Sequence, residues 1–378
     1  MDLATVRGID HGRRVRLAID AMGGDHAPEE VVAGALEHAA ESPYDQLILV
    51  GIPERITALC PAGLPPNVAI EAASQVVGMH EHPALALREK KDSSILVACD
   101  LVRRGRADAV ITAGHTGAGM AAAVLRLGRV PGVDRPALAI QMVTETGPLV
   151  LLDIGANPDS TPENLAQYAQ MGSLFAERAL GVDRPRVALL SIGEEKGKGD
   201  ARIQRATELL DETSLNFTGN VEGKDLVHHP ADVVVCDAVL GNVTIKFFEG
   251  LATFIFDRWA QEFRGSLRGR LAYLLMRPGI GRIRRTFDYE ALGGSPLLGV
   301  RGTVIITHGR AKRRMVKHAI RVGAAAARVG LPDLIAETFR PAAPEGAGAA
   351  GAAEREAEPA TAPAGPAAES PPAAEAPA

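Results

Sequence analysis

The stretch T-A-G-H-T-G-A-G at residues 112–119 decides the organisation of this chain. The mainly apolar residues 108–111 before it are typical of a buried parallel strand, and the Ala- and Leu-rich residues 120–127 after it predict a helix. A glycine-rich turn between them leaves backbone N–H groups unpaired at a helix N-terminus, where an anion is favoured. We interpret Gly114, His115, Thr116 and Gly117 as a phosphate loop, with a tight turn of purely geometric purpose as the alternative.

The same pattern of strand and polar loop recurs along the chain. Apolar runs alternate with segments of helical composition, and they lie at residues 15–20, 46–50, 67–71, 137–142, 149–153, 187–192, 232–237 and 303–307. Strands that are apolar throughout indicate a mostly parallel sheet covered on both faces, so the predicted fold class is α/β. Ligands of such sheets lie beyond the carboxyl ends of the strands, and we expect the loops there to converge on one crevice. These loops follow Asp20, Ile111, Asp153, Ile192 and Asp237.

Side chains near two of these strand ends are candidates for catalysis. Lys196 and Lys198 stand in a glycine-rich loop, where an ammonium group would stabilise a phosphate or developing negative charge. A solvent-exposed turn, whose lysines pair with the glutamates at 194–195, is the alternative. Asn242 precedes a helix that we predict to begin near Val243, and it is either the N-cap of that helix or an amide that polarises a carbonyl group.

Further polar and glycine positions after strands are assigned to the substrate pocket, and these are Asp20, Gly23, Gly24, Asp25, Asp153 and Asn157. The spacing of the acids matches no known metal loop, so we expect no metal and no cofactor. A G-x-S-x-G sequence is absent, and no cysteine stands in a glycine loop beside a histidine. A covalent acyl-enzyme is therefore unsupported.

Composition limits the class of protein. The tail at 341–378 carries the formal charge of −5, so the body is close to neutral and nucleic-acid binding is not expected. The 3 cysteines are widely spaced, which favours a reducing cytoplasm without disulfides. Residues 1–12 are expected to be a loose leader, residues 13–335 an α/β domain, and the Ala/Pro/Glu-rich tail disordered. No apolar run approaches the roughly 18–20 residues that a membrane-spanning helix needs.

Residues 243–290 differ in composition from the rest of the domain. Aromatic residues gather on more than one face of the helical stretch 243–263, which favours a homodimer interface, with a buried core helix as the alternative. Residues 264–285 hold seven arginines and no acid, interleaved with leucines. We expect this projecting segment to dock on an anionic membrane or an acidic carrier protein, and a solvated hairpin is the alternative. The arginines are Arg264, Arg268, Arg270, Arg277, Arg282, Arg284 and Arg285.

Taken together, these segments resemble the bacterial phosphate acyltransferase family, the acyl-carrier-protein:phosphate acyltransferases of phospholipid synthesis. The resemblance covers about residues 15–329. It rests on I-D-A-M-G-G-D-H-A-P at 19–28, K-K-D-S-S at 90–94, A-G-H-T-G-A at 113–118, L-L-D-I-G-A-N at 151–157, Q-Y-A-Q-M-G-S at 167–173, S-I-G-E-E-K-G-K-G at 191–199, F-T-G-N-V-E at 217–222, G-N-V-T-I-K at 241–246 and G-G-S-P-L-L-G at 293–299. His115 departs from the family, which commonly has Asn there.

The resemblance implies a homodimer with a three-layer α/β/α fold, similar to phosphotransacetylases and isocitrate dehydrogenases. It implies transfer of an acyl group from acyl-carrier protein to inorganic phosphate, giving acyl phosphate for a downstream glycerol-3-phosphate acyltransferase. It also implies a cytoplasmic enzyme that docks peripherally on the membrane. In the expected mechanism, phosphate held by residues 114–117 and by Lys196 or Lys198 attacks the thioester directly, and Asn242 or backbone N–H groups stabilise the oxyanion.

Three other functions fit parts of the sequence. A phosphate acetyl- or butyryltransferase would use coenzyme A in place of carrier protein, although a small thioester needs no arginine-rich projection. A metal- and NAD-dependent decarboxylating dehydrogenase would share the expected fold. A non-catalytic membrane scaffold would account for the projection alone.

Overall fold

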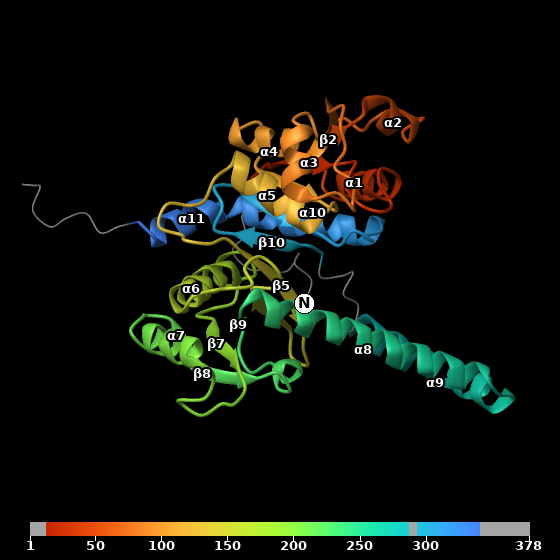
Figure 1. Cartoon of the computed structure of the whole chain (residues 1–378). Coiled ribbons are helices and arrows are strands. Elements are labelled where there is room, and N and C mark those ends of the chain that lie inside the picture. Colours follow the sequence, from red (N-terminus) through yellow and green to blue (C-terminus); the bar gives the residue numbers. More distant parts are fainter. Residues whose placement is uncertain (1–12, 287–292, 341–378) are drawn as a thin grey trace, which may run out of the picture. The chain divides into compact units, whose positions relative to one another are not determined.

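The structure, a computed structural model, describes residues 13–286 and 293–340, without the side chains of 284–286. Its centre is one sheet of 11 strands in the order β3-β2-β1-β4-β11-β10-β5-β6-β9-β7-β8 (Figure 1). The strands are β1 Arg16–Asp20, β2 Gln46–Gly51, β3 Val68–Ala72, β4 Ala109–Thr112, β5 Ala137–Val143, β6 Pro148–Leu152, β7 Arg186–Ser191, β8 Asn216–Glu222, β9 Val233–Val235, β10 Ser295–Leu298 and β11 Thr303–Ile306.

The sheet consists of two parallel halves that run in opposite directions. In the first half, β3, β2, β1, β4 and β11 pair in parallel. In the second half, β6, β9, β7 and β8 pair in parallel. The antiparallel pairs β11–β10, β10–β5 and β5–β6 join the halves and reverse the strand direction. The carboxyl ends of the first half and those of the second half therefore lie at opposite edges of the sheet.

Helices cover both faces of the sheet, which confirms the predicted three-layer α/β/α class with a mostly parallel sheet. In the first half, one face packs against α1 and α10, and the other face against α4 and α5. In the second half, α6 covers one face and the first turns of α8 pack on the other. The helices are α1 Glu29–Glu41, α2 Pro53–Ala58, α3 Pro83–Glu89, α4 Ser94–Arg103, α5 Thr116–Arg126, α6 Pro162–Arg178, α7 Ala201–Asp211, α8 Ala238–Arg264, α9 Leu267–Thr286, α10 Arg313–Arg328 and α11 Leu331–Thr338.

Helix α8 begins five residues earlier than the sequence predicts. Its N-cap is Asp237, whose side chain accepts the N–H groups of Val239 and Leu240 at 3.0 Å each. Asn242 consequently lies inside the helix, so its interpretation as the N-cap is wrong. The role of its amide at a reacting carbonyl group stays a prediction.

Helices α8 and α9 form the projecting hairpin that the sequence predicts. Only Ala238, Gly241 and Ile245 of α8 are buried, and Figure 1 shows α8 leaving the sheet with α9 running back beside it. Large apolar side chains on both helices are exposed, among them Phe247 at 70% and Leu267 at 82%. Within residues 13–286 and 293–340, α8 is the one helix that could cross a membrane by length and composition, which corrects the expectation that no such run exists, and the core helix of a soluble protein can meet the same criteria.

Candidate active site

A chain of hydrogen bonds forms the floor of the first-half carboxyl edge. Strands β1 and β4 are adjacent and in register, with Asp20 beside Thr112. The Thr112 hydroxyl donates to Asp20 Oδ2 at 2.7 Å and accepts the Gly114 N–H at 3.0 Å. Burial raises the pKa of Asp20, and hydrogen bonds from the hydroxyls of Ser94 and Thr112 oppose this shift. Asp20 thus holds the turn at residue 114 in place from beneath.

Three loops of the first half contact one another next to these hydrogen bonds. A Cβ on Gly23 would lie 2.5 Å from Asp20 Oδ2 and 2.8 Å from the Gly114 nitrogen, so only glycine allows the two loops to approach this closely. The loop after β1 is also tied to the loop after β11, because the Asp25 N–H donates to the Gly309 carbonyl at 2.8 Å. Gly24, which has φ +115°, makes the turn between these contacts.

The N-terminus of α5 keeps two backbone donors available. His115 is the N-cap, and its Nδ1 accepts the Gly117 N–H at 3.1 Å. The Gly114 N–H is already bonded to Thr112, whereas the N–H groups of His115 and Thr116 have no acceptor among the described residues. These two donors lie at the positive end of the helix dipole, where an anion is favoured. The phosphate loop predicted at 114–117 therefore has two main-chain groups to offer.

The imidazole of His115 adds a third donor at this helix end. Because a backbone N–H can only donate, Nδ1 must be the unprotonated nitrogen of the ring. The neutral ring then carries its proton on Nε2, which leaves Nε2–H as a hydrogen-bond donor. An Asn at this position would have a shorter side chain. His115 stands where the resembled family commonly has Asn, and it still caps the helix while placing its donor farther from the backbone.

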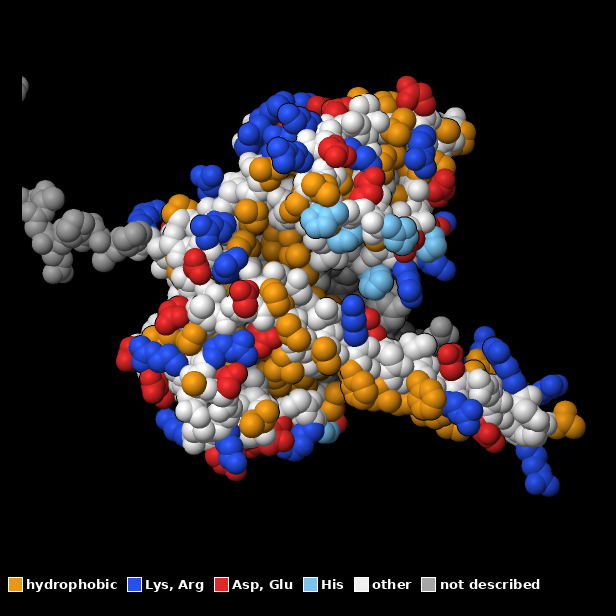
Figure 2. Space-filling model, viewed as in Figure 1, with side chains coloured by type: hydrophobic (Ala, Val, Ile, Leu, Met, Phe, Trp, Pro, Cys, Tyr) orange, Lys and Arg blue, Asp and Glu red, His pale blue; other side chains and the backbone are white. Residues whose placement is uncertain are grey.

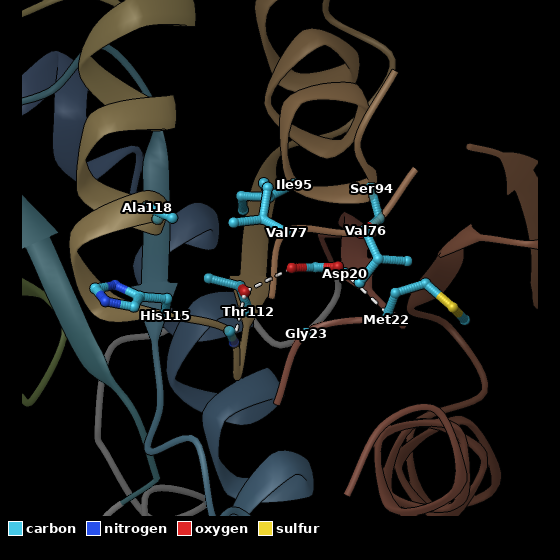
Figure 3. A pocket seen from close by; sticks show the side chains of 12 residues that line it. Asp20, Met22, Gly23, Val76, Val77, Ser94, Ile95, Thr112, His115 and Ala118 are labelled. Carbon is cyan, nitrogen blue, oxygen red and sulfur yellow. Dashed lines mark hydrogen bonds between the residues drawn. The ribbon is translucent and has the colours of Figure 1, made fainter. Parts of the chain in front are cut away.

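A cavity of about 250 Å³, open to solvent, lies beside this loop between α4 and α5. Figure 3 shows Asp20 and Thr112 facing each other at its base, with Val76, Val77 and Ile95 on one wall. The K-K-D-S-S motif builds that wall, since Lys90 Nζ donates to the Val76 carbonyl at 2.7 Å. The role of this motif in the described structure is thus to shape the cavity.

The acid at the end of β6 has a different environment from Asp20. Asp153 is fully buried and accepts five hydrogen bonds: from the N–H groups of Leu138, Gly155, Ala156 and Asn157, and from Asn157 Nδ2. Burial raises its pKa, and these N–H groups oppose the shift. Asn157 Nδ2 also donates to the Pro136 carbonyl at 2.6 Å. Asp153 and Asn157 therefore hold their own loop, and their assignment to the substrate pocket stays a prediction.

The two candidate lysines after β7 differ in their contacts. Lys196 is 86% exposed, and its ammonium lies 3.3 Å from Asp211 Oδ2 on α7. Lys198 is exposed, and its ammonium makes no contact with a described residue. Neither lysine pairs with the glutamates at 194–195. The part of the alternative in which the lysines form ion pairs with these glutamates is therefore wrong. Lys198 is the one that is available to a ligand.

One face of α8 carries polar residues from the second half towards the first. Asn242, Lys246 and Glu249 follow the i, i+4, i+7 spacing of a single helix face. Burial raises the pKa of Glu249, while electrostatic interactions with His308 and Lys246 oppose the shift. Because His308 belongs to the loop after β11, this part of α8 lies near the first-half carboxyl edge. Sequence reasoning missed Lys246, although its spacing from Asn242 in G-N-V-T-I-K was visible.

Basic side chains border the hollow between α8 and the first half. Figure 2 shows histidines gathered on the first-half side of this hollow and basic side chains on both of its sides. Among the described residues, no group of three His, Cys, Asp or Glu side chains is placed to hold a metal ion. This arrangement favours an anionic ligand.

The arginines of the projecting hairpin lie apart from these loops. Those at the end of α8 and on α9 are exposed, and they are Arg264, Arg268, Arg270, Arg277 and Arg282. The side chains of Arg284 and Arg285 lie outside the described residues. Docking of a membrane or a carrier protein here stays a prediction.

Comparison with known proteins gives consistent results over most of the chain. A family model described as "Fatty acid synthesis protein" matches residues 15–333. A phosphate acyltransferase of Heliobacterium modesticaldum is 49% identical over 311 residues, which are 82% of this chain and 92% of that protein. A phosphate acyltransferase of Brevibacillus brevis is 44% identical over 307 residues, 81% of this chain and 92% of that protein.

Solved structures of low sequence identity share the fold. A phosphotransacetylase from Streptococcus pyogenes has a TM-score of 0.59 at 18% identity, covering 86% of this chain and 99% of that one. The EutD phosphotransacetylase from Staphylococcus aureus has a TM-score of 0.55 at 16% identity, covering 84% and 95%. The likeness to phosphotransacetylases predicted from the sequence is confirmed at the level of the fold.

Proposed function

Because the chain belongs to the phosphate acyltransferase family, as a transferase that acts on phosphate and an acyl donor, we propose that its donor is a fatty acyl thioester of acyl-carrier protein. The products are acyl phosphate and free carrier protein. The acyl phosphate then supplies a glycerol-3-phosphate acyltransferase in phospholipid synthesis.

One observation carries this proposal: the N-terminus of α5 offers the unpaired N–H groups of His115 and Thr116 together with the Nε2–H of His115. Three donors at a helix N-terminus suit the oxygens of a phosphate, which remains largely ionised near neutral pH. The neighbouring face of α8 provides Asn242 and Lys246 for the reacting groups.

The reaction needs positioning more than acid–base chemistry. A phosphate oxygen attacks the thioester carbon, the new C–O bond forms, and the C–S bond breaks with departure of the phosphopantetheine thiolate. The Asn242 amide donates to the oxyanion. Lys198, whose loop leaves the opposite carboxyl edge of the sheet, stabilises negative charge on the thioester donor that enters from that edge. A covalent enzyme intermediate is unnecessary, because phosphate is itself the nucleophile.

The hairpin suits macromolecular contacts. Exposed apolar side chains on α8, including Val243 at 61% and Phe254 at 61%, provide a surface for a second copy of the chain. The exposed arginines of α9 suit an acidic carrier protein or an anionic membrane. In this proposal the enzyme is a cytoplasmic homodimer that docks peripherally on the membrane.

An assay of donor preference tests the proposal. Purified chain is incubated with inorganic phosphate and either palmitoyl-carrier protein or palmitoyl-coenzyme A, and acyl phosphate is trapped with hydroxylamine. We expect phosphate-dependent product with a kcat/KM at least about tenfold higher for the carrier-protein thioester. Equal or higher efficiency with the coenzyme A thioester would instead assign a coenzyme A-dependent phosphate acyltransferase.

A further inference from the structure

Helix α8 crosses the sheet from one carboxyl edge to the other. Its N-cap, Asp237, follows β9 at the second-half edge. Two turns later, Ile245 joins the apolar cluster that contains Met142 and Leu149. Met142 lies near the carboxyl end of β5, and β5 runs in the same direction as β11, because both are antiparallel to β10. Glu249, one turn after Lys246, interacts electrostatically with His308, so this turn of the helix lies near the edge where the first-half loops leave the sheet.

The loop that α8 approaches holds His308 in a defined orientation. His308 Nδ1 accepts the Arg310 N–H at 3.2 Å, so the neutral ring carries its proton on Nε2, as in His115. The loop itself is fixed, since Thr307 N–H donates to the Thr112 carbonyl at 2.8 Å and the Gly309 carbonyl accepts the Asp25 N–H. Two histidines on loops after adjacent strands thus present the same type of donor.

Strand pairing places these donors within reach of one ligand. Strands β4 and β11 are parallel neighbours, with Thr112 opposite Ile306, so His308 follows its strand at nearly the level where His115 follows β4. Neighbouring strands lie about 4.8 Å apart. A phosphate is small enough to accept hydrogen bonds from both loops at once.

We propose that Lys246 and His308 are phosphate ligands that complete the site begun by His115 and Thr116, so that the anion is held between α8 and the first half. This inference rests on the proposed function and adds residues to its phosphate site. The ammonium of Lys246 supplies the positive charge that the neutral histidines and the backbone cannot supply. Glu249, half-buried on the same helix face, interacts electrostatically with both Lys246 and His308.

In this assignment, each half of the sheet binds a different substrate. Phosphate binds at the first-half edge, whereas Asn242, one turn earlier on the same helix face, and Lys198 lie towards the second half and meet the thioester. The phosphodiester of the donor's phosphopantetheine carries the same kind of anionic oxygens as inorganic phosphate, so it is the other ligand that these residues could bind. Replacement of Lys246 distinguishes the two ligands. If Lys246 binds inorganic phosphate, only phosphate should then bind more weakly, and if it binds the phosphodiester, only the acyl donor should.

The test compares Lys246→Met, Lys246→Arg and His308→Ala with the parent chain. Binding of inorganic phosphate is measured by isothermal titration calorimetry, and KM is measured separately for phosphate and for palmitoyl-carrier protein. We expect Lys246→Met to raise the Kd and KM for phosphate at least about tenfold, with the donor KM changed less than about twofold. Lys246→Arg should restore most of the affinity, and His308→Ala should weaken phosphate binding about fivefold.

Lys224→Met is the matched control, since Lys224 is an exposed second-half lysine that bonds Glu222 at 2.6 Å, and its phosphate affinity should equal that of the parent. Thermal unfolding verifies that each variant is folded. Unchanged phosphate affinity in Lys246→Met, no measurable phosphate binding by the parent, or a rise in the donor KM alone would each overturn the inference. If the parent binds phosphate through Lys246 but forms no acyl phosphate, the proposed function fails while the inference stands.

Discussion

The two carboxyl edges of the sheet have similar sequences and different hydrogen bonding. In each, a buried strand ends in an aspartate that a glycine-containing loop follows, I-D-A-M-G-G at the first-half edge and L-L-D-I-G-A-N at the second. Asp20 accepts the Thr112 hydroxyl as well as the Met22 N–H of its own loop, and the α5 N-terminus above it keeps the N–H groups of His115 and Thr116 available. Asp153 instead accepts the backbone N–H groups of its own loop.

This difference shows that a buried acid at a strand end does not by itself indicate a ligand site. A ligand site is indicated by backbone N–H groups of a neighbouring loop that have no acceptor within the protein. The loop at Asp153 uses its N–H groups on its own carboxylate, whereas the loop at 114–117 retains two N–H groups for an anion. Helix α8 then connects the two edges through its polar face.

The largest expected effect concerns the structural role of Asp153. Replacement Asp153→Ala leaves four backbone N–H groups without this acceptor, while Asn157 Nδ2 keeps the Pro136 carbonyl, so we expect the free energy of unfolding to fall by roughly 3 to 5 kcal/mol. Urea unfolding followed by circular dichroism measures this loss. Asp153→Asn keeps one oxygen acceptor and should lose less. A loss below about 1 kcal/mol for the alanine variant would show that the loop does not depend on this carboxylate.

The features that the sequence predicted are those encoded locally. The turn at 112–119 lies between a short strand and an Ala-rich helix, and both its glycines and its cap are within a few residues of each other. The start of α8 was placed too late, although Asp237 is a good N-cap residue. A Cβ on Gly241 would clash with the Asp153 carbonyl oxygen, so the position requires glycine. This glycine serves packing between segments that are distant in sequence.

The arrangement of the candidate loops could not be deduced from local pattern. The second half is reversed by the antiparallel pair β5–β6, because β10, four residues that pair antiparallel with both β11 and β5, leaves β5 running in the direction of β11. Nothing in S-P-L-L distinguishes it from a parallel strand. The opposite edges of Asp20 and Asp153 follow from the three antiparallel pairs together, so the expectation that the loops after all five strands converge on one crevice is wrong.

A second prediction sharpens the comparison by removing charge from the second-half edge. The double replacement of Lys196 and Lys198 by Met should lower kcat/KM for acyl transfer at least about 100-fold, because stabilisation of developing negative charge is lost. Stability should be nearly unchanged, since both side chains are exposed. The single variants separate the two lysines: Lys198→Met should account for most of the loss, because Lys196 already bonds Asp211. Full activity in the double variant would remove both lysines from the mechanism.

The smallest expected effect concerns an ion pair behind the first-half loops. Glu30, in the first turn of α1, accepts the Arg313 backbone N–H at 2.8 Å and bonds its guanidinium at 2.7 Å, so it caps α10 from outside. These hydrogen bonds from Arg313 lower the pKa of Glu30 to about 2. A lowered carboxyl pKa stabilises the fold above the ordinary value of 4.5, and this contribution is lost as the pH falls towards 2.

The replacement Glu30→Gln measures this contribution. Because Arg313 is 54% exposed and solvent screens the pair, we expect a loss of only about 0.5 to 1 kcal/mol in the free energy of unfolding at about pH 7. The difference from the parent chain should shrink when urea unfolding is repeated at about pH 3. Burial acts on Asp153 with the opposite sign, since it raises that pKa and disfavours the ionised form in the fold. A difference that stayed constant between the two pH values would mean that the carboxylate charge of Glu30 does not stabilise this edge, and that its contribution comes from the neutral cap alone.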